Sequence, residues 1–134
     1  MKPKWWNKGK RQLCKRDRVM KKLFSTYRGH LTTRNNFFYS LTRSIISQQI
    51  SVSAADSVFS KFEKKCKGKI NPKVVNKLSI SNLRKCGLSR LKAKGIKSLA
   101  KKILEKSFDP KLIKNMDDEE AILYLSSLKQ IGRW

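Results

Sequence analysis

The hydrophobic positions of the chain recur at helical spacing almost throughout. Apolar side chains three or four residues apart predict amphipathic helices, whereas no stretch alternates apolar and polar residues as a half-buried strand would. Five groups form the stripes: Leu13, Met20, Leu23, Phe24 and Tyr27; Phe37, Phe38, Leu41, Ile45 and Ile46; Val52, Ala55, Val58, Phe59 and Phe62; Leu91, Ile96, Leu99, Ala100, Ile103 and Leu104; Ala121, Ile122, Leu125 and Leu128. The sequence therefore predicts an all-α fold.

Polar residues and glycines mark where these helices begin and end. Ser51 is placed to accept hydrogen bonds from the first N–H groups of the third helix. Asp117, with a glutamate three residues later, predicts a capping box at the start of the last helix. A short helix over residues 81–85 is expected to end at Gly87 in the left-handed conformation. Residues 66–72 are expected to form a loop, because they include Gly68 and an Asn-Pro pair.

Lysine and arginine strongly outnumber the acidic residues, 33 against 9, which gives a formal net charge of +24. Such an excess indicates a polyanionic partner, because neutralising phosphates releases counterions and favours binding. An anionic membrane surface is the alternative. Nucleic acid is favoured because the apolar residues are patterned for a core, and none forms a sustained stripe that could face lipid.

The basic residues concentrate between Lys64 and Lys102, where the chain has no Asp or Glu. The run contains Lys64, Lys65, Lys67, Lys69, Lys73, Lys77, Arg84, Lys85, Arg90, Lys92, Lys94, Lys97, Lys101 and Lys102. It predicts either a surface that contacts a nucleic-acid backbone or the solvated helix faces of a lysine-rich protein.

The cysteines indicate neither a disulfide framework nor a metal site. Cys14, Cys66 and Cys86 are odd in number and widely spaced, with no Cys-x-x-Cys pair. No secretory segment is recognisable either. We therefore expect a protein of the reducing cytoplasm, associated with the nucleoid.

Three stretches carry the specific signal. The first is Ile-Ile-Ser-Gln-Gln-Ile-Ser-Val-Ser-Ala-Ala, at residues 45–55. The second is Cys-Gly-Leu-Ser-Arg-Leu-Lys-Ala, at residues 86–93. The third is Leu-Lys-Gln-Ile-Gly-Arg-Trp, at residues 128–134. In the third, a helix is followed by a glycine-containing turn and by the expected start of a new helix. Such a hairpin lets the backbone approach a DNA phosphate closely.

Together the three stretches resemble the 3-methyladenine DNA glycosylase II group of the helix-hairpin-helix DNA glycosylases. The resemblance implies a helical bundle forming one domain over residues 1–134. Within it we expect an N-terminal helical segment at 1–33, a helical core at 34–125 and the start of the hairpin at 126–134. The domain would be incomplete, because the group's catalytic Asp lies roughly two dozen residues beyond the hairpin and no carboxylate of this chain matches it.

The resemblance also implies roles for individual residues. The loop that includes Gln48, Gln49 and Ser51 would lie in the minor groove, and the Gln49 side chain would fill the gap left by a flipped nucleotide. Gln130 and Gly132 in the hairpin would hold a phosphate, although the group usually has glycine at the position of Gln130.

Two further roles come from relatives in the same way. Trp134 matches an aromatic residue that lines the base pocket, where an indole face attracts the positive charge of alkylated purines. Carbonyls matching Ser126, Leu128 and Gln130 bind a monovalent cation, Na+ or K+, in some relatives. No cofactor is required.

The function implied is base-excision repair: monofunctional hydrolysis of the N-glycosidic bond of alkylated purines such as 3-methyladenine, by a monomer acting on double-stranded DNA. The 134 residues alone are expected not to catalyse. One alternative is a bifunctional glycosylase/lyase of the same superfamily, which would need a lysine nucleophile in the hairpin's second helix. The other is a basic, non-catalytic nucleic-acid-binding protein of ribosomal or nucleoid type, for which charge alone would suffice.

Overall fold

A computed structural model describes residues 1–34 and 36–133 of the chain, and these residues contain helices and no β-strand. The predicted all-α fold is therefore confirmed. The chain forms two compact units, Met1–Asn35 and Asn36–Trp134. The division lies close to the boundary predicted after residue 33. That the two units make up a single domain stays a prediction.

The N-terminal unit consists of two helices, α1 (Trp6–Arg16) and α2 (Arg18–Thr26), where the apolar pattern predicts one segment. The break occurs at Asp17, whose extended backbone and side chain cap α2 by accepting a hydrogen bond from the Met20 N–H. The rings of Trp6 in α1 and Phe24 in α2 pack edge to face, with their centroids 6.3 Å apart. This contact helps to hold the two helices together.

The C-terminal unit contains α3 (Phe37–Ser47), α4 (Val52–Lys65), α5 (Pro72–Lys77), α6 (Ile80–Arg84), α7 (Arg90–Leu104), the 3-10 turn η1 (Leu112–Asn115) and α8 (Asp118–Ser126). The predicted caps are confirmed: Ser51 caps α4, Gly87 has φ +98°, and Asp117 forms the capping box of α8. The structure adds α5, part of which was expected to be loop. Asn71 caps it and Pro72 occupies its first position, where proline needs no N–H partner.

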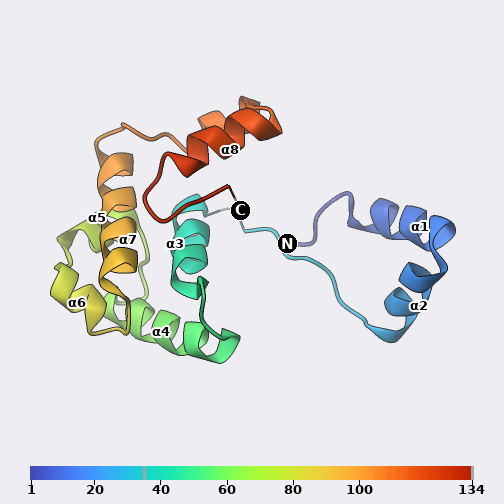
Figure 1. The fold of residues 1–134 in the computed structure, drawn as a ribbon, viewed down its shortest axis with the longest axis horizontal. Helices are drawn as coiled ribbons and strands as arrows, with labels where there is room; N and C mark the ends of the chain where they lie inside the picture. The colour runs from blue at the N-terminus through green and yellow to red at the C-terminus, as the bar shows by residue number, and fades with distance from the viewer. Residues whose placement is uncertain (35, 134) are drawn as a thin grey trace. The chain divides into compact units, whose positions relative to one another are not determined.

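The helix α7 is the centre of this unit and packs against α3, α5 and α6 (Figure 1). Five of its residues are buried: Ala93, Gly95, Ile96, Leu99 and Ala100. Three of the five are alanine or glycine, so neighbouring segments can lie close to its axis. The core therefore forms around one helix, to which the shorter helices are fitted.

Three lysines of α7 fix the ends of the surrounding helices. The Lys92 ammonium donates hydrogen bonds to Ile46 O and Gln48 O at the end of α3. Lys97 donates to Asn76 O and Leu78 O at the end of α5, and Lys102 to Ser127 O at the end of α8, at 3.5 Å. The terminal carbonyls of a helix lack intrahelical partners and carry its negative dipole end, so a cation there is stabilising.

Stacked aromatic rings join α8 to the core. The Phe37 and Phe108 rings lie 5.8 Å apart, and the Phe108 and Tyr124 rings 4.6 Å apart. The Tyr124 hydroxyl also accepts a hydrogen bond from the Asp109 N–H at 2.9 Å. Leu128, which was expected on the face of the last helix, lies beyond its end and is buried with an exposed fraction of 3%.

Gly95 lets the segment after α8 lie directly against α7. A Cβ atom at this position would be 2.7 Å from Gln130 Cγ and 3.2 Å from the Lys129 carbonyl oxygen. Both distances are shorter than ordinary van der Waals contacts. The close approach of the two segments therefore requires glycine at position 95.

We predict that Gly95→Ala destabilises the C-terminal unit, although alanine favours an isolated helix over glycine by about 1 kcal/mol. The added methyl group would push Gln130 and Lys129 away, and overpacking of this kind typically removes about 1–3 kcal/mol from the free energy of unfolding. Thermal and denaturant unfolding followed by circular dichroism measure the change.

Gly132→Ala is the matched control, because no atom lies within 4 Å of a Cβ built there. Its melting temperature should equal that of the wild type. A Gly95→Ala protein that melts at or above the wild-type temperature would show that the two segments are not packed as described.

Candidate nucleic-acid interface

The loop between α3 and α4 presents Gln49 to solvent. The helix α3 ends at Ser47, and α4 begins at Val52 behind its cap, Ser51. Gln49, between them, is exposed and has a φ of +56°. A non-glycine residue in this region is strained by about 1–3 kcal/mol, and such strain concentrates at functional sites. The geometry thus places Gln49 at the tip of the loop.

Two apolar side chains close to Gln49 in the sequence are also exposed. One of them, Val52, was expected on the apolar face of α4, and that expectation is wrong. Ile50 has an exposed fraction of 41% and Val52 of 80%. Apolar side chains that enter a stack of bases are a recurrent means of kinking DNA. The loop and the start of α4 therefore expose one polar side chain, Gln49, and two apolar ones, Ile50 and Val52.

The second predicted site is the turn after α8. The Ile131 N–H donates a hydrogen bond to Leu128 O at 3.2 Å, and Gln130 has a φ of +68°. A bond from the fourth residue to the first, with a left-handed third residue, is the pattern of a type II turn, which prefers glycine at that third position. Gly132 follows the turn, is exposed, and has open space where a Cβ would point.

Residues 131–133 have no regular secondary structure. Arg133 is the one described residue of the expected second helix, and a single residue cannot form a helical turn, so the start of that helix stays a prediction. Trp134, the predicted base-pocket residue, lies outside the described residues.

A hydrogen bond joins the loop to the turn. The Gln48 side-chain amide donates to the backbone carbonyl of Gln130 across 2.6 Å, although the two residues are 82 positions apart. A pocket of about 280 Å3 opens beside this bond, and both Gln48 and Gly132 line it. Gln48 is half-buried, so its side chain supports the interface from behind, whereas Gln49 faces outward.

Lys92 holds the same loop from the other side. Its Nζ lies 2.8 Å from Ile46 O and 2.6 Å from Gln48 O. Burial lowers the pKa of this lysine, because desolvation penalises the ammonium form. The three sequence motifs thus meet at Gln48, whose carbonyl accepts from Lys92 and whose amide donates to Gln130.

Of the three carbonyls predicted to bind a monovalent cation, those of Leu128 and Gln130 belong to the turn, and Ser126 is the last residue of α8. Leu128 O accepts the hydrogen bond from Ile131, and Gln130 O accepts the one from Gln48. A carbonyl oxygen has two lone pairs, so both can still accept a further partner. Neutral carbonyl oxygens suit hard cations. The residues present, with Ser126, therefore fit the implied ion.

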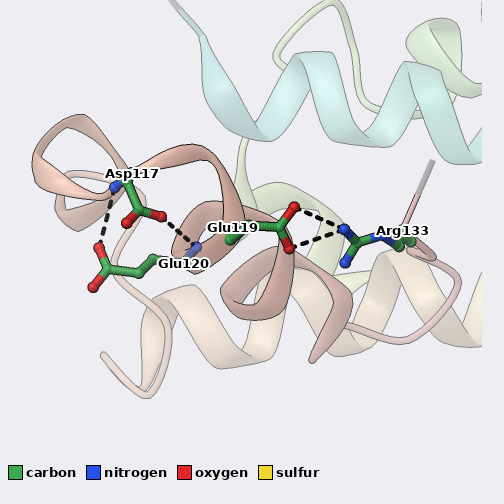
Figure 2. Close-up of polar contacts among 4 residues, drawn as sticks. All are labelled: Asp117, Glu119, Glu120 and Arg133. Atoms are coloured by element: carbon green, nitrogen blue, oxygen red, sulfur yellow. Dashed lines mark hydrogen bonds and ion pairs between the residues drawn. The ribbon is translucent and has the colours of Figure 1, made fainter.

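The carboxylates nearest to the turn in the sequence have structural partners (Figure 2). Asp117 and Glu120 form the predicted capping box at the start of α8, each accepting from the other's N–H. Glu119 accepts two hydrogen bonds from Arg133, at 2.7 and 2.9 Å. Asp117 and Glu120 are therefore confirmed as capping residues, whereas Glu119 joins α8 to the C-terminal segment.

Burial divides the basic run between Lys64 and Lys102 into two classes. Lys92, Lys97 and Lys102, the three that contact helix ends, are half-buried, and every other lysine and arginine of the run is exposed. Some of the exposed residues line a groove of about 770 Å3 at the turn between α6 and α7, namely Arg84, Lys85 and Arg90. Lys92, Lys97 and Lys102 therefore fit neither interpretation of the run, because they bond to helix-end carbonyls. For the exposed residues, both interpretations stay predictions.

Neither a metal cluster nor a membrane span is found within residues 1–34 and 36–133. No group of three His, Cys, Asp or Glu side chains there could hold a metal ion, and no helix is long and apolar enough to cross a bilayer. Cys66 and Cys86 are free thiols in the core, and burial raises the pKa of Cys66 to about 11. They pack as small apolar residues.

Comparisons with known proteins agree with this geometry. The family model for the HhH-GPD superfamily of base excision DNA repair proteins matches residues 42–132, which include both the loop and the turn. A curated relative, the alkylbase DNA glycosidase-like protein mag2 of Schizosaccharomyces pombe, is 32% identical over 98 residues, which are 70% of this chain and 46% of mag2.

Solved structures have the same fold. The 3-methyladenine DNA glycosylase Mag1 of S. pombe, in complex with abasic DNA, has a TM-score of 0.81 and 25% identity, over 95% of this chain and 65% of Mag1. The DNA-3-methyladenine glycosidase of Bacillus halodurans has a TM-score of 0.75 and 25% identity, over 91% of this chain and 57% of that one. The chain thus spans about half the length of its curated relative and under two thirds of these structures.

We predict that Gln130→Gly stabilises the turn after α8. Glycine adopts a positive φ without the strain that Gln130 bears, and its backbone keeps the carbonyl that Gln48 contacts. We expect the free energy of unfolding to rise by up to about 1 kcal/mol. Denaturant unfolding checks the value, with Gln49→Gly as a comparison at the other left-handed glutamine. A clear loss of stability in Gln130→Gly would contradict the strained-turn geometry.

Proposed function

The chain belongs to the HhH-GPD superfamily of base excision DNA repair proteins, and we propose that its loop and turn together bind double-stranded DNA at a damaged base. The observation that carries this proposal is the meeting of three separate motifs at Gln48. A protein that bound DNA by charge alone would not need such a junction. The protein as a whole would hydrolyse the N-glycosidic bond of alkylated purines such as 3-methyladenine.

The proposed division of labour follows from what each segment exposes. Gln49 would enter the duplex where the damaged nucleotide rotates out, and its side chain would offset part of the unstacking free energy of a few kcal/mol. The N–H groups around Gly132 would bind a backbone phosphate, because nothing obstructs a close approach there. The exposed lysines and arginines would add affinity that does not depend on sequence.

The bond-breaking step is not assigned to any described residue. The resemblance implies an Asp beyond the hairpin for that role, and the carboxylates of α8 serve in capping and in the pair with Arg133. The described residues would bind the duplex, hold it and open it. A monovalent cation on the carbonyls of Ser126, Leu128 and Gln130 would supply positive charge beside the bound phosphate.

We predict that the chain binds a duplex with a central abasic site more tightly than the intact duplex, and that Gln49→Ala removes most of that preference. The missing base leaves a gap that Gln49 can fill without an unstacking penalty, whereas intact DNA must first be opened. Fluorescence anisotropy titrations of both duplexes at several salt concentrations provide the ratio of dissociation constants.

Gly132→Ala is the comparison in the same assay, because it would hinder phosphate binding in both duplexes. It should weaken both complexes by a similar factor and leave their ratio unchanged. A wild-type chain with equal affinity for the two duplexes at every salt concentration would favour the alternative, a binding protein that acts through charge.

A further inference from the structure

Lys92 occupies an unusual place for a half-buried cation. It lies in the first turn of α7, where the positive end of the helix dipole disfavours a lysine. Its side chain reaches instead to the C-terminal end of α3, which is the negative end of that helix dipole. No carboxylate accepts from it within the described part of the chain; its acceptors are Ile46 O and Gln48 O.

The second of these acceptors immediately precedes the exposed loop tip. Gln48 caps the end of α3, and Gln49 follows it in the left-handed conformation. Gln48 is fixed at two points, because its carbonyl accepts from Lys92 and its side-chain amide donates to Gln130. Without Lys92, two carbonyls at the end of α3 lose their donor, and the residue before Gln49 keeps only the side-chain anchor.

We propose that Lys92 is a positioning residue for Gln49, acting through the backbone of Gln48. This inference rests on the proposed function, in which Gln49 enters damaged DNA. Lys92 holds the loop tip in its strained, outward conformation before DNA arrives, so the strain is not introduced during binding. The ammonium does not contact a phosphate, because its hydrogen bonds are directed into the protein and its side chain is half-buried.

The same helix offers a matched control. Lys97 contacts the end of α5 through Asn76 O, at 2.9 Å, and Leu78 O, and it is half-buried like Lys92. The two lysines therefore share a helix, a chemical role and a degree of burial. Only Lys92 touches the loop that carries Gln49. Lys94, exposed on α7, serves as a second control for loss of a surface charge.

The experiment compares Lys92→Met, Lys97→Met and Lys94→Met with the wild-type chain. Anisotropy titrations at several salt concentrations give affinities for the intact and the abasic duplex. A 2-aminopurine placed beside the abasic site reports insertion at saturating protein, where a difference in stability or affinity no longer matters. Circular dichroism confirms that each variant is folded. Lys92→Gln, which keeps two uncharged N–H donors on a shorter side chain, replaces Lys92→Met should the latter unfold.

We expect Lys92→Met to reduce the preference for the abasic duplex about tenfold, or until none remains, a change of about 1.4 kcal/mol. The change in 2-aminopurine fluorescence on binding should be smaller than with the wild type. The salt dependence of its affinity for DNA should match that of the wild type. Lys97→Met should keep both the preference and the signal. Lys92→Gln should lie between Lys92→Met and the wild type.

Three results would overturn the inference, and they are distinct. Equal preferences in Lys92→Met and Lys97→Met would leave Lys92 with a structural role alone. If Lys92→Met lowers by about 1 the magnitude of the slope of the logarithm of the binding constant against the logarithm of salt concentration, and weakens both complexes alike, Lys92 contacts a phosphate. A wild-type chain without any abasic preference would overturn the proposed function and this inference with it, whereas the first two results leave the proposed function standing.

Discussion

The satisfaction of helix-end carbonyls by the lysines of α7 is the interaction on which the rest of the C-terminal unit depends. Most helices here are short, so a large share of their carbonyls lies in a last turn and has no intrahelical donor. Lys92, Lys97 and Lys102 supply donors to the ends of α3, α5 and α8. A spacing of five residues turns each lysine by about 140° around the helix from the last. One helix can therefore fix three others on different sides.

This arrangement explains how an acid-free, strongly basic stretch can be part of a folded core. The half-buried lysines have backbone carbonyls as partners, and the other lysines and arginines of the stretch are exposed to solvent, where a polyanion could reach them. The structural and the DNA-binding roles are thus divided among residues of one type. They meet at Gln48, where the cap on α3 becomes the support of the exposed loop. Stability and proposed recognition share that one junction.

The sequence predicts the helices well and their mutual contacts poorly. Ser51, Gly87 and Asp117 act within a few residues of their own position, so local pattern was enough to place them. The sequence analysis missed the break between α1 and α2 and the helix α5. At Asp17 a cap interrupts an otherwise continuous apolar pattern, and at Pro72 a residue typical of loops begins a helix. The resemblance indicated Gln48 and Gln130 as separate contacts to DNA. Their hydrogen bond spans 82 residues, and no spacing rule encodes it.

The central claim is that the loop at Gln49 and the turn at Gly132 form one interface, supported from behind by Gln48 and Lys92. Hydrogen exchange of the chain with and without a saturating abasic duplex tests it most directly. Our account predicts that amides of residues 49–52 and 131–133 gain protection together, at the same concentration of DNA. Protection confined to the exposed lysines of α4 to α6, with both segments unchanged, would contradict it.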